Sequence, residues 1–143
     1  MTSGSVLPTL LGTAAMLLAG CGPKEVRPAE IFPEDNCSQC RMAISDQSFA
    51  SEIVTADEVF KFDDIGCLEK FRDGIQPAMI IAAFVKDYDT KEWVRRERAY
   101  VVRTGLQTPM GSGLAAFSDS LRALKMLVGH APPASGGTGE GTQ

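Results

Sequence analysis

Short strand-like segments alternate with helical segments along this sequence, which predicts an α+β fold. Two further observations refine the prediction. An uninterrupted apolar run in the middle of the chain is typical of a strand buried on both faces, and a block in the second half resembles one in the first. We therefore predict two ββαβ units, the second of which lacks its last strand.

The first unit begins with two segments rich in β-branched and aromatic residues, 49–54 and 59–62, which predict a hairpin. Asp64 then leads into a stretch in which Leu68 and Phe71 are spaced for one face of a helix with an acidic first turn. The apolar run over residues 79–85 supplies the third strand. The order of elements in the first half is therefore ββαβ.

The second unit is less complete. Residues 93–94 and 99–102 predict another strand pair. Apolar residues recur at helical spacing over residues 118–127, which predicts an amphipathic helix with Ser118 as its N-terminal cap. No strand signal follows this helix.

Two blocks suggest that the units are copies of each other. Residues 62–71 and 108–117 align with a leucine and a phenylalanine at matching positions. These identities are weak support alone, but the order of the elements around them also repeats. We therefore expect a duplicated fold.

The chemistry of the chain is concentrated in the motif Cys37-x-x-Cys40-x-Met42. Thiolate and thioether ligands select soft metals such as Cu(I) and Zn(II), and the thioether favours Cu(I). If the segment is extended, Cys40 and Met42 share a face and Cys37 points away, unless the backbone turns between the cysteines. A short disulfide, half of a structural zinc site and an ordinary core methionine are the alternatives.

The first 20 residues carry no charge and include an apolar run with the length of a signal-peptide core. The run ends in the sequence LAGC at residues 18–21, which resembles the bacterial lipoprotein signal. We expect residues 1–20 to be a signal peptide and Cys21 to carry the lipid that anchors the protein to a membrane. Gly22 in place of Asp points to the outer membrane of a Gram-negative cell.

Composition confines the folded part to one domain. Residues 21–35 contain prolines and mixed charges without periodicity and predict a tether, whereas residues 131–143 predict a disordered tail. Residues 36–130 remain, enough for a single modest core. The 14 basic and 18 acidic side chains give a net charge of −4, which argues against nucleic acid as a partner.

Three motifs in the same order resemble the NosL family: the cysteine motif behind a lipoprotein leader, FKFDDIGC over residues 60–67, and TPMGSGLAAF over residues 108–117. The resemblance runs from Cys21 to about His130. It implies a periplasm-facing Cu(I) chaperone that delivers copper to nitrous oxide reductase, for assembly of its copper–sulfide centre, together with the maturation machinery of that enzyme. The implied fold, two ββαβ units, is also seen in the organomercurial lyase. The Gly-rich C-terminus departs from the family, where a closing strand would be expected.

Within that resemblance, Cys40 and Met42 are the expected primary copper ligands. The remaining candidate donors are two further cysteines, a methionine in a predicted loop and the one histidine of the sequence: Cys37, Cys67, Met110 and His130. Met110 is favoured as a third donor because a proline and two glycines around it fix an exposed turn. Cys67 also suits a small buried residue at the start of a helix.

Enzymatic functions remain as alternatives to a binding protein. Cys37 and Cys40 could exchange disulfides, although thioredoxin-like sites place the pair at a helix start after a strand. A lyase like the organomercurial enzyme would use Cys40, Cys67 and Asp64 at a carbon–metal bond. A structural zinc site would need four nitrogen or sulfur ligands. Asp63 and Asp64 are expected to serve as helix cap and first-turn charges.

Overall fold

The computed structural model describes residue 1 and residues 25–129, and it confirms the α+β fold. Within residues 25–129, six strands form two antiparallel sheets: β1 (Ser51–Val54), β2 (Val59–Phe62), β3 (Ala82–Lys86) and β4 (Trp93–Arg95) in the order β2-β1-β3-β4, and β5 (Tyr100–Arg103) with β6 (Leu114–Phe117). The helices are α1 (Ile65–Gly74) and α2 (Ser120–Gly129). Short 3-10 turns occur at Gln47–Phe49, Pro77–Met79 and Arg96–Arg98.

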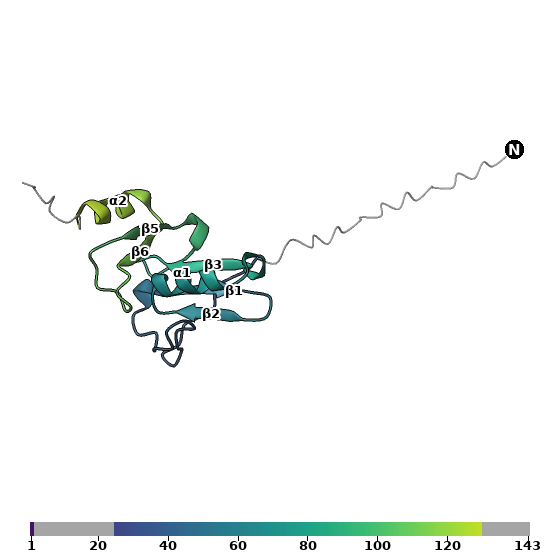
Figure 1. Ribbon diagram of the computed structural model, residues 1–143. Helices are drawn as coiled ribbons and strands as arrows, with labels where there is room; N and C mark the ends of the chain where they lie inside the picture. The colour runs from purple at the N-terminus through teal and green to yellow at the C-terminus, as the bar shows by residue number, and fades with distance from the viewer. Residues whose placement is uncertain (2–24, 130–143) are drawn as a thin grey trace, which may run out of the picture.

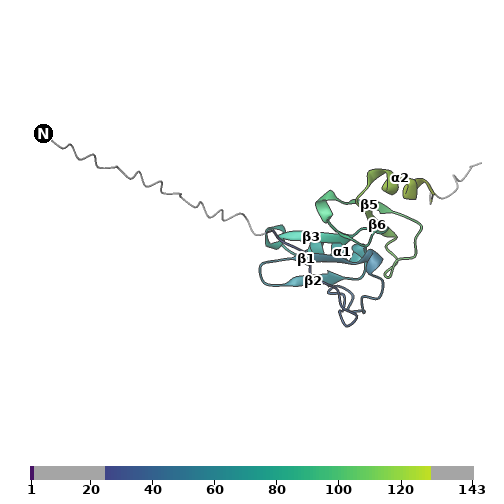
Figure 2. The same cartoon turned by 180° about the vertical axis from the view of Figure 1, so that it is seen from behind.

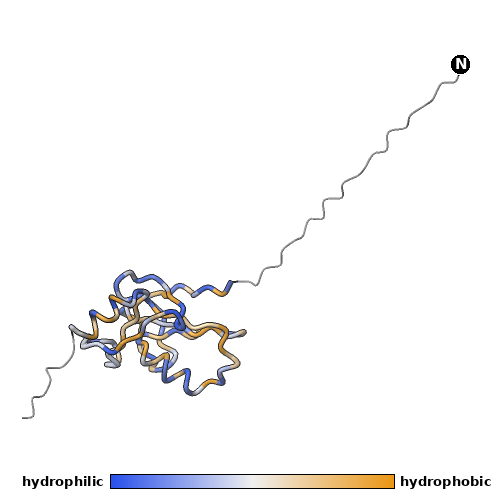
Figure 3. Tube along the Cα trace, turned by 90° about the horizontal axis from the view of Figure 1, so that it is seen from above, coloured by the Kyte–Doolittle hydropathy of each residue, from blue (hydrophilic) through white to orange (hydrophobic). Residues whose placement is uncertain are grey.

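The two helices pack on different sheets, and the first turn of α1 also contacts β6 of the second sheet. The α1 helix packs on β1 and β2, and α2 packs on β5 and β6 at the other end of the molecule (Figures 1 and 2). Apolar stretches run through the middle of the trace, whereas many hydrophilic stretches lie on its outer turns (Figure 3). Among the helices of residues 25–129, none is long and apolar enough to cross a bilayer.

The predicted first hairpin is confirmed, with Ser51 opposite Phe62 in an antiparallel register. The third strand begins later than predicted, at Ala82, because Pro77 starts a 3-10 turn before it. The predicted pairing of residues 93–94 with 99–102 is wrong. Strand β4 pairs with β3, and β5 pairs with β6, because the 3-10 turn Arg96–Arg98 separates the two segments.

The alignment of the two halves is also wrong in its register. It places Leu68 on Leu114, but Leu68 lies in α1 and Leu114 begins strand β6, so the two positions are not equivalent. The order strand, strand, helix does occur twice, as β1-β2-α1 and β5-β6-α2, and no strand follows α2 within residues 25–129. Duplication of the unit remains a prediction.

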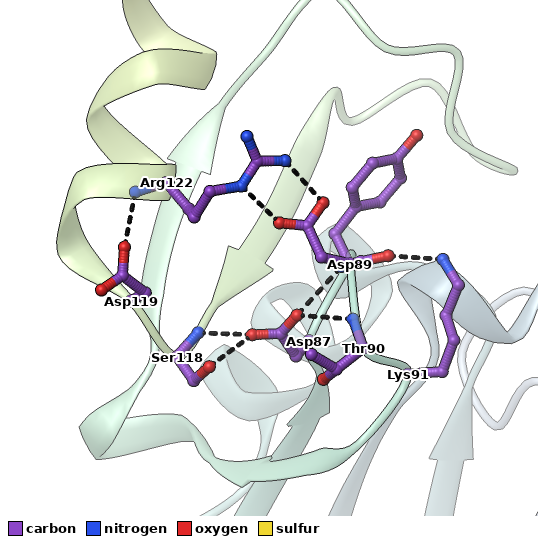
Figure 4. Close-up of polar contacts among 8 residues, drawn as sticks. Asp87, Asp89, Thr90, Lys91, Ser118, Asp119 and Arg122 are labelled. Atoms are coloured by element: carbon purple, nitrogen blue, oxygen red, sulfur yellow. Dashed lines mark hydrogen bonds and ion pairs between the residues drawn. The ribbon is translucent and has the colours of Figure 1, made fainter.

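The two sheets are joined at Asp87, just after β3. A parallel bridge links Asp87 to Ala116 of β6, and the Asp87 carboxylate accepts the backbone N–H (2.6 Å) and hydroxyl (2.7 Å) of Ser118 (Figure 4). Its other oxygen accepts the N–H groups of Asp89 and Thr90. Although burial works against the charge, the donors of Ser118, Thr90 and Asp89 lower the pKa of Asp87 to about 2.

The sequence predicted Ser118 as the cap of α2, and this prediction is wrong. Asp119 takes that role, because its carboxylate accepts the N–H of Arg122 at 2.8 Å. The Arg122 guanidinium in turn forms two hydrogen bonds, of 2.7 and 2.8 Å, with Asp89 in the turn after β3 (Figure 4). The Ser118 hydroxyl thus helps to join the two sheets, and the Asp119 carboxylate caps α2.

The segment before the first strand lies against the domain. Ala29 donates its N–H to the buried Glu52 carboxylate of β1 (3.0 Å), and Lys61 of β2 donates to the carbonyl of Glu30 (2.7 Å). Ile31 is buried in a small apolar cluster. Residues 25–35, the described part of the predicted tether, thus lie against the first sheet and continue directly into the cysteine motif.

Candidate metal centre

The cysteine motif forms a tight turn. The N–H of Cys37 donates to the carbonyl of Met42 (2.8 Å), and the N–H of Arg41 donates to the carbonyl of Cys37 (2.9 Å). Arg41 has a φ of 68°, in the left-handed region that non-glycine residues rarely adopt. The backbone therefore turns between the two cysteines, which is the second of the two conformations considered above, and their thiol sulfurs lie within 4.8 Å of each other.

The turn is attached to the edge of the first sheet. Ser38 donates its N–H to the carbonyl of Lys61 in β2 (2.7 Å), and Lys61 donates its N–H to the Ser38 hydroxyl (3.2 Å). The Lys61 ammonium also pairs with Asp35, just before the motif, at 2.6 Å. Contacts on both sides thus hold the turn against β2.

Three thiols and one carboxylate converge where the turn meets the start of α1. One ligand atom from each of Cys37, Cys40, Cys67 and Asp63 lies within 4.8 Å of the other three. Asp63 follows the last residue of β2, and Cys67 lies in the first turn of α1. The fold therefore unites residues that are up to 30 positions apart in the chain.

The three thiols differ in accessibility. Cys37 and Cys67 are buried in the main apolar core, whereas Cys40 is partly exposed, and all three are free. The Cys40 thiol lies 3.5 Å from one carboxylate oxygen of Asp63 and 3.7 Å from the other. Cys40 therefore forms the outward side of the cluster.

Burial raises the pKa of the Cys37 thiol. Burial also raises the pKa of Cys67, and repulsion from Cys37 and Asp63 adds to the effect. Without a cation, these thiols therefore hold their protons. A bound cation lowers the pKa of these thiols, because the neighbouring negative groups then stabilise the cation and no longer oppose ionisation of the thiols. Protons therefore leave as the cation binds.

The two candidate methionines lie beside the cluster, each on a different cavity. Met110 and Cys67 line a cavity of about 340 Å³, and Met42 and Asp63 line one of about 330 Å³. Met42 and Met110 are 57% and 42% exposed, respectively. Two of the thiols are therefore buried, whereas both methionines are exposed at the surface beside the cluster.

Asp63 is the candidate ligand that the sequence analysis did not include. It was expected to be a cap or first-turn charge, but the cap of α1 is Asp64, whose carboxylate accepts the N–H of Gly66 at 2.6 Å. One carboxylate is enough for a cap, so the second residue of the pair could have been recognised as available for another role. His130 and Cys21 lie outside the described residues.

Comparisons with known proteins identify a family and a similar fold. A family model described as NosL matches residues 28–131. The crystal structure of the copper chaperone NosL from Shewanella denitrificans is similar in fold, with a TM-score of 0.65 and 19% sequence identity over 76% of this chain and 90% of that chain. No curated protein matches the chain significantly.

Proposed function

The chain belongs to the NosL family, and on this premise we propose that it binds Cu(I) and passes the ion to an acceptor protein. The observation that supports this proposal most strongly is the convergence of three thiols in one cluster. Thiolate sulfur is a preferred ligand of Cu(I), and a compact thiol group is what a protein needs to hold that ion.

Each candidate ligand has a place in this proposal. Cys40 is the primary ligand and, as the partly exposed thiol, the one that an acceptor can reach, whereas Cys37 and Cys67 complete the sulfur set from the core. Met42 and Met110 are thioether donors at the two cavities beside the cluster. Asp63 accepts the hydrogen of the Cys40 thiol and so orients it.

The uneven burial suits transfer of the ion. An acceptor can approach Cys40 and replace it as a ligand while the buried thiols still hold the copper. Such an exchange needs no free ion in solution, because the ion is shared between donor and acceptor ligands throughout. A fully buried site would block that exchange.

The finer proposal concerns the acceptor and the place of action. We propose delivery of copper for the copper–sulfide centre of nitrous oxide reductase, by a protein anchored through a lipid on Cys21 to the outer membrane and facing the periplasm. The family and the LAGC sequence at residues 18–21 support this proposal. In cells that lack the protein, the reductase should fold without its full copper–sulfide centre, most clearly when copper is scarce.

The family is one of copper chaperones and not of enzymes. A metal alternative has a specific observation in its favour, because three thiols with one carboxylate also satisfy four-coordinate Zn(II). The test must therefore compare the two ions directly.

Competition titration of the reduced mature protein against a Cu(I) chelator provides that test. We expect one Cu(I) per chain, displacement of Zn(II) by Cu(I), and loss of tight binding in Cys40→Ala. Met42→Ala should weaken binding, whereas Met79→Ala, a similarly exposed methionine (50%) that lines neither cavity, should not. Full Cu(I) affinity in Cys40→Ala, or a preference for Zn(II), would overturn the proposal.

A further inference from the structure

The loop between β5 and β6 carries Met110 and is held to α1 by one buried side chain, Asp64. The Asp64 carboxylate is fully buried, and one of its oxygens caps α1 through the N–H of Gly66. The second oxygen leaves the helix and accepts the Thr108 hydroxyl (2.7 Å) and the N–H of Met110 (3.0 Å). An ordinary helix cap makes no such contacts with a distant loop.

Hydrogen bonds within the β5–β6 loop fix its conformation. The Thr108 hydroxyl that donates to Asp64 also accepts the N–H of Gly113 (3.1 Å), and the N–H of Gly111 closes a turn on the Thr108 carbonyl (3.0 Å). Both glycines have positive φ values, 69° and 67°, which other residues adopt with strain. The loop therefore has one defined shape, and Asp64 fixes where that shape sits.

Close packing reinforces the position of the loop. A Cβ on Gly66, in the first turn of α1, would lie 2.6 Å from the Cβ of Ser112 in the loop, closer than two such atoms can approach. The same helix turn carries Cys67, and Cys67 and Met110 line one cavity. The distance between that thiol and that thioether therefore depends on how the loop is seated.

From these contacts we infer that Asp64 is a positioning residue for copper binding, which holds the Met110 thioether beside the Cys67 thiol. The inference rests on the proposed function and goes further in assigning a role to a residue that touches no metal. Partners that orient ligands typically change metal affinity ~10–100-fold when they are removed. We expect an effect of that size here.

The test is a double-mutant cycle on the reduced mature protein. Asp64→Asn keeps an acceptor for the helix cap but places an N–H₂ group against the N–H of Met110. We expect Cu(I) affinity to fall ~10–100-fold, with fewer sulfur neighbours around copper in X-ray absorption. In the Met110→Ala background, Asp64→Asn should add no further loss.

Two other variants keep the result interpretable. Asp119→Asn makes the same change at the cap of α2, away from the cluster, and should leave Cu(I) affinity unchanged. If Asp64→Asn does not fold, as judged by circular dichroism, Thr108→Val is measured in its place, since it removes the hydrogen bond between the Thr108 hydroxyl and Asp64.

The inference is wrong if Asp64→Asn, or Thr108→Val in its place, binds Cu(I) with the wild-type affinity and sulfur count. An equal loss of affinity with and without Met110 would also overturn it. Either result leaves the proposed function intact as long as the wild-type protein binds Cu(I) and Cys40→Ala does not, so the two failures are distinguishable.

Discussion

Glu52 gives the fold a pH dependence that can be measured. Its side chain is fully buried in the first sheet, and one carboxylate oxygen has no partner among the described residues. Burial raises the pKa of Glu52 to about 7, against the lowering effects of the Ala29 N–H and of Lys61 and Lys86. Asp35 adds a smaller increase. The folded protein therefore binds this proton more tightly than the unfolded chain.

The magnitude follows from the two pKa values. A rise from 4.5 to about 7 corresponds to about 3 kcal/mol, since each pKa unit is ~1.4 kcal/mol. Because the folded-state pKa is the higher one, this contribution to the free energy of unfolding is present below pH 4.5 and is lost as the pH rises through about 7.

Urea unfolding of the apoprotein between pH 5 and pH 8 measures the effect. Glu52→Gln cannot titrate, so its free energy of unfolding should fall less than that of the wild type across this range. Glu58→Gln, the same change at an exposed position in the β1–β2 turn, should follow the wild type. Parallel pH profiles for Glu52→Gln and the wild type would refute the reasoning.

Three further results are expected. Asp87→Asn should destabilise the protein by roughly 2 kcal/mol at pH 7, because a charged acceptor shared by several donors is lost, and the benefit of Asp87 in the wild type should disappear as the pH falls through about 2; unfolding by urea and by acid checks both. Gly66→Ala should weaken Cu(I) binding in a chelator titration with little change in helix content, since its Cβ displaces Ser112; unchanged affinity would contradict the close packing of the loop. In the reduced apoprotein, Cys40 should react with iodoacetamide before the two buried thiols, and mass spectrometry of the modified peptides would reveal any other order.

Local patterns predicted the parts of the fold that depend on neighbours in the chain. The hairpin of β1 and β2 follows from two β-rich segments around a short turn, and α1 follows from the spacing of Leu68 and Phe71 after an acidic cap. The partner of β4 could not be predicted in this way. Its pairing with β3 depends on the turn that Asp87 closes and on the 3-10 turn that follows β4.

The candidate site shows the same division. The spacing of Cys37 and Cys40 marked a metal motif, but the left-handed backbone of Arg41, which makes that segment a turn, has no sequence signal because arginine rarely adopts it. The approach of Cys67 and Asp63 to the motif depends on how β2 and α1 pack. Contacts between distant segments are set by packing of the whole core, which periodicity does not describe.

X-ray absorption at the copper edge of the reduced, Cu(I)-loaded protein tests the central claim most directly. If Cys37, Cys40 and Cys67 hold the ion, the spectrum should show Cu(I) in a shell dominated by sulfur, and Cys40→Ala should lose part of that shell or the copper itself. A shell of mainly nitrogen and oxygen donors, or an unchanged sulfur shell in Cys40→Ala, would contradict the assignment of the thiol cluster as the copper site.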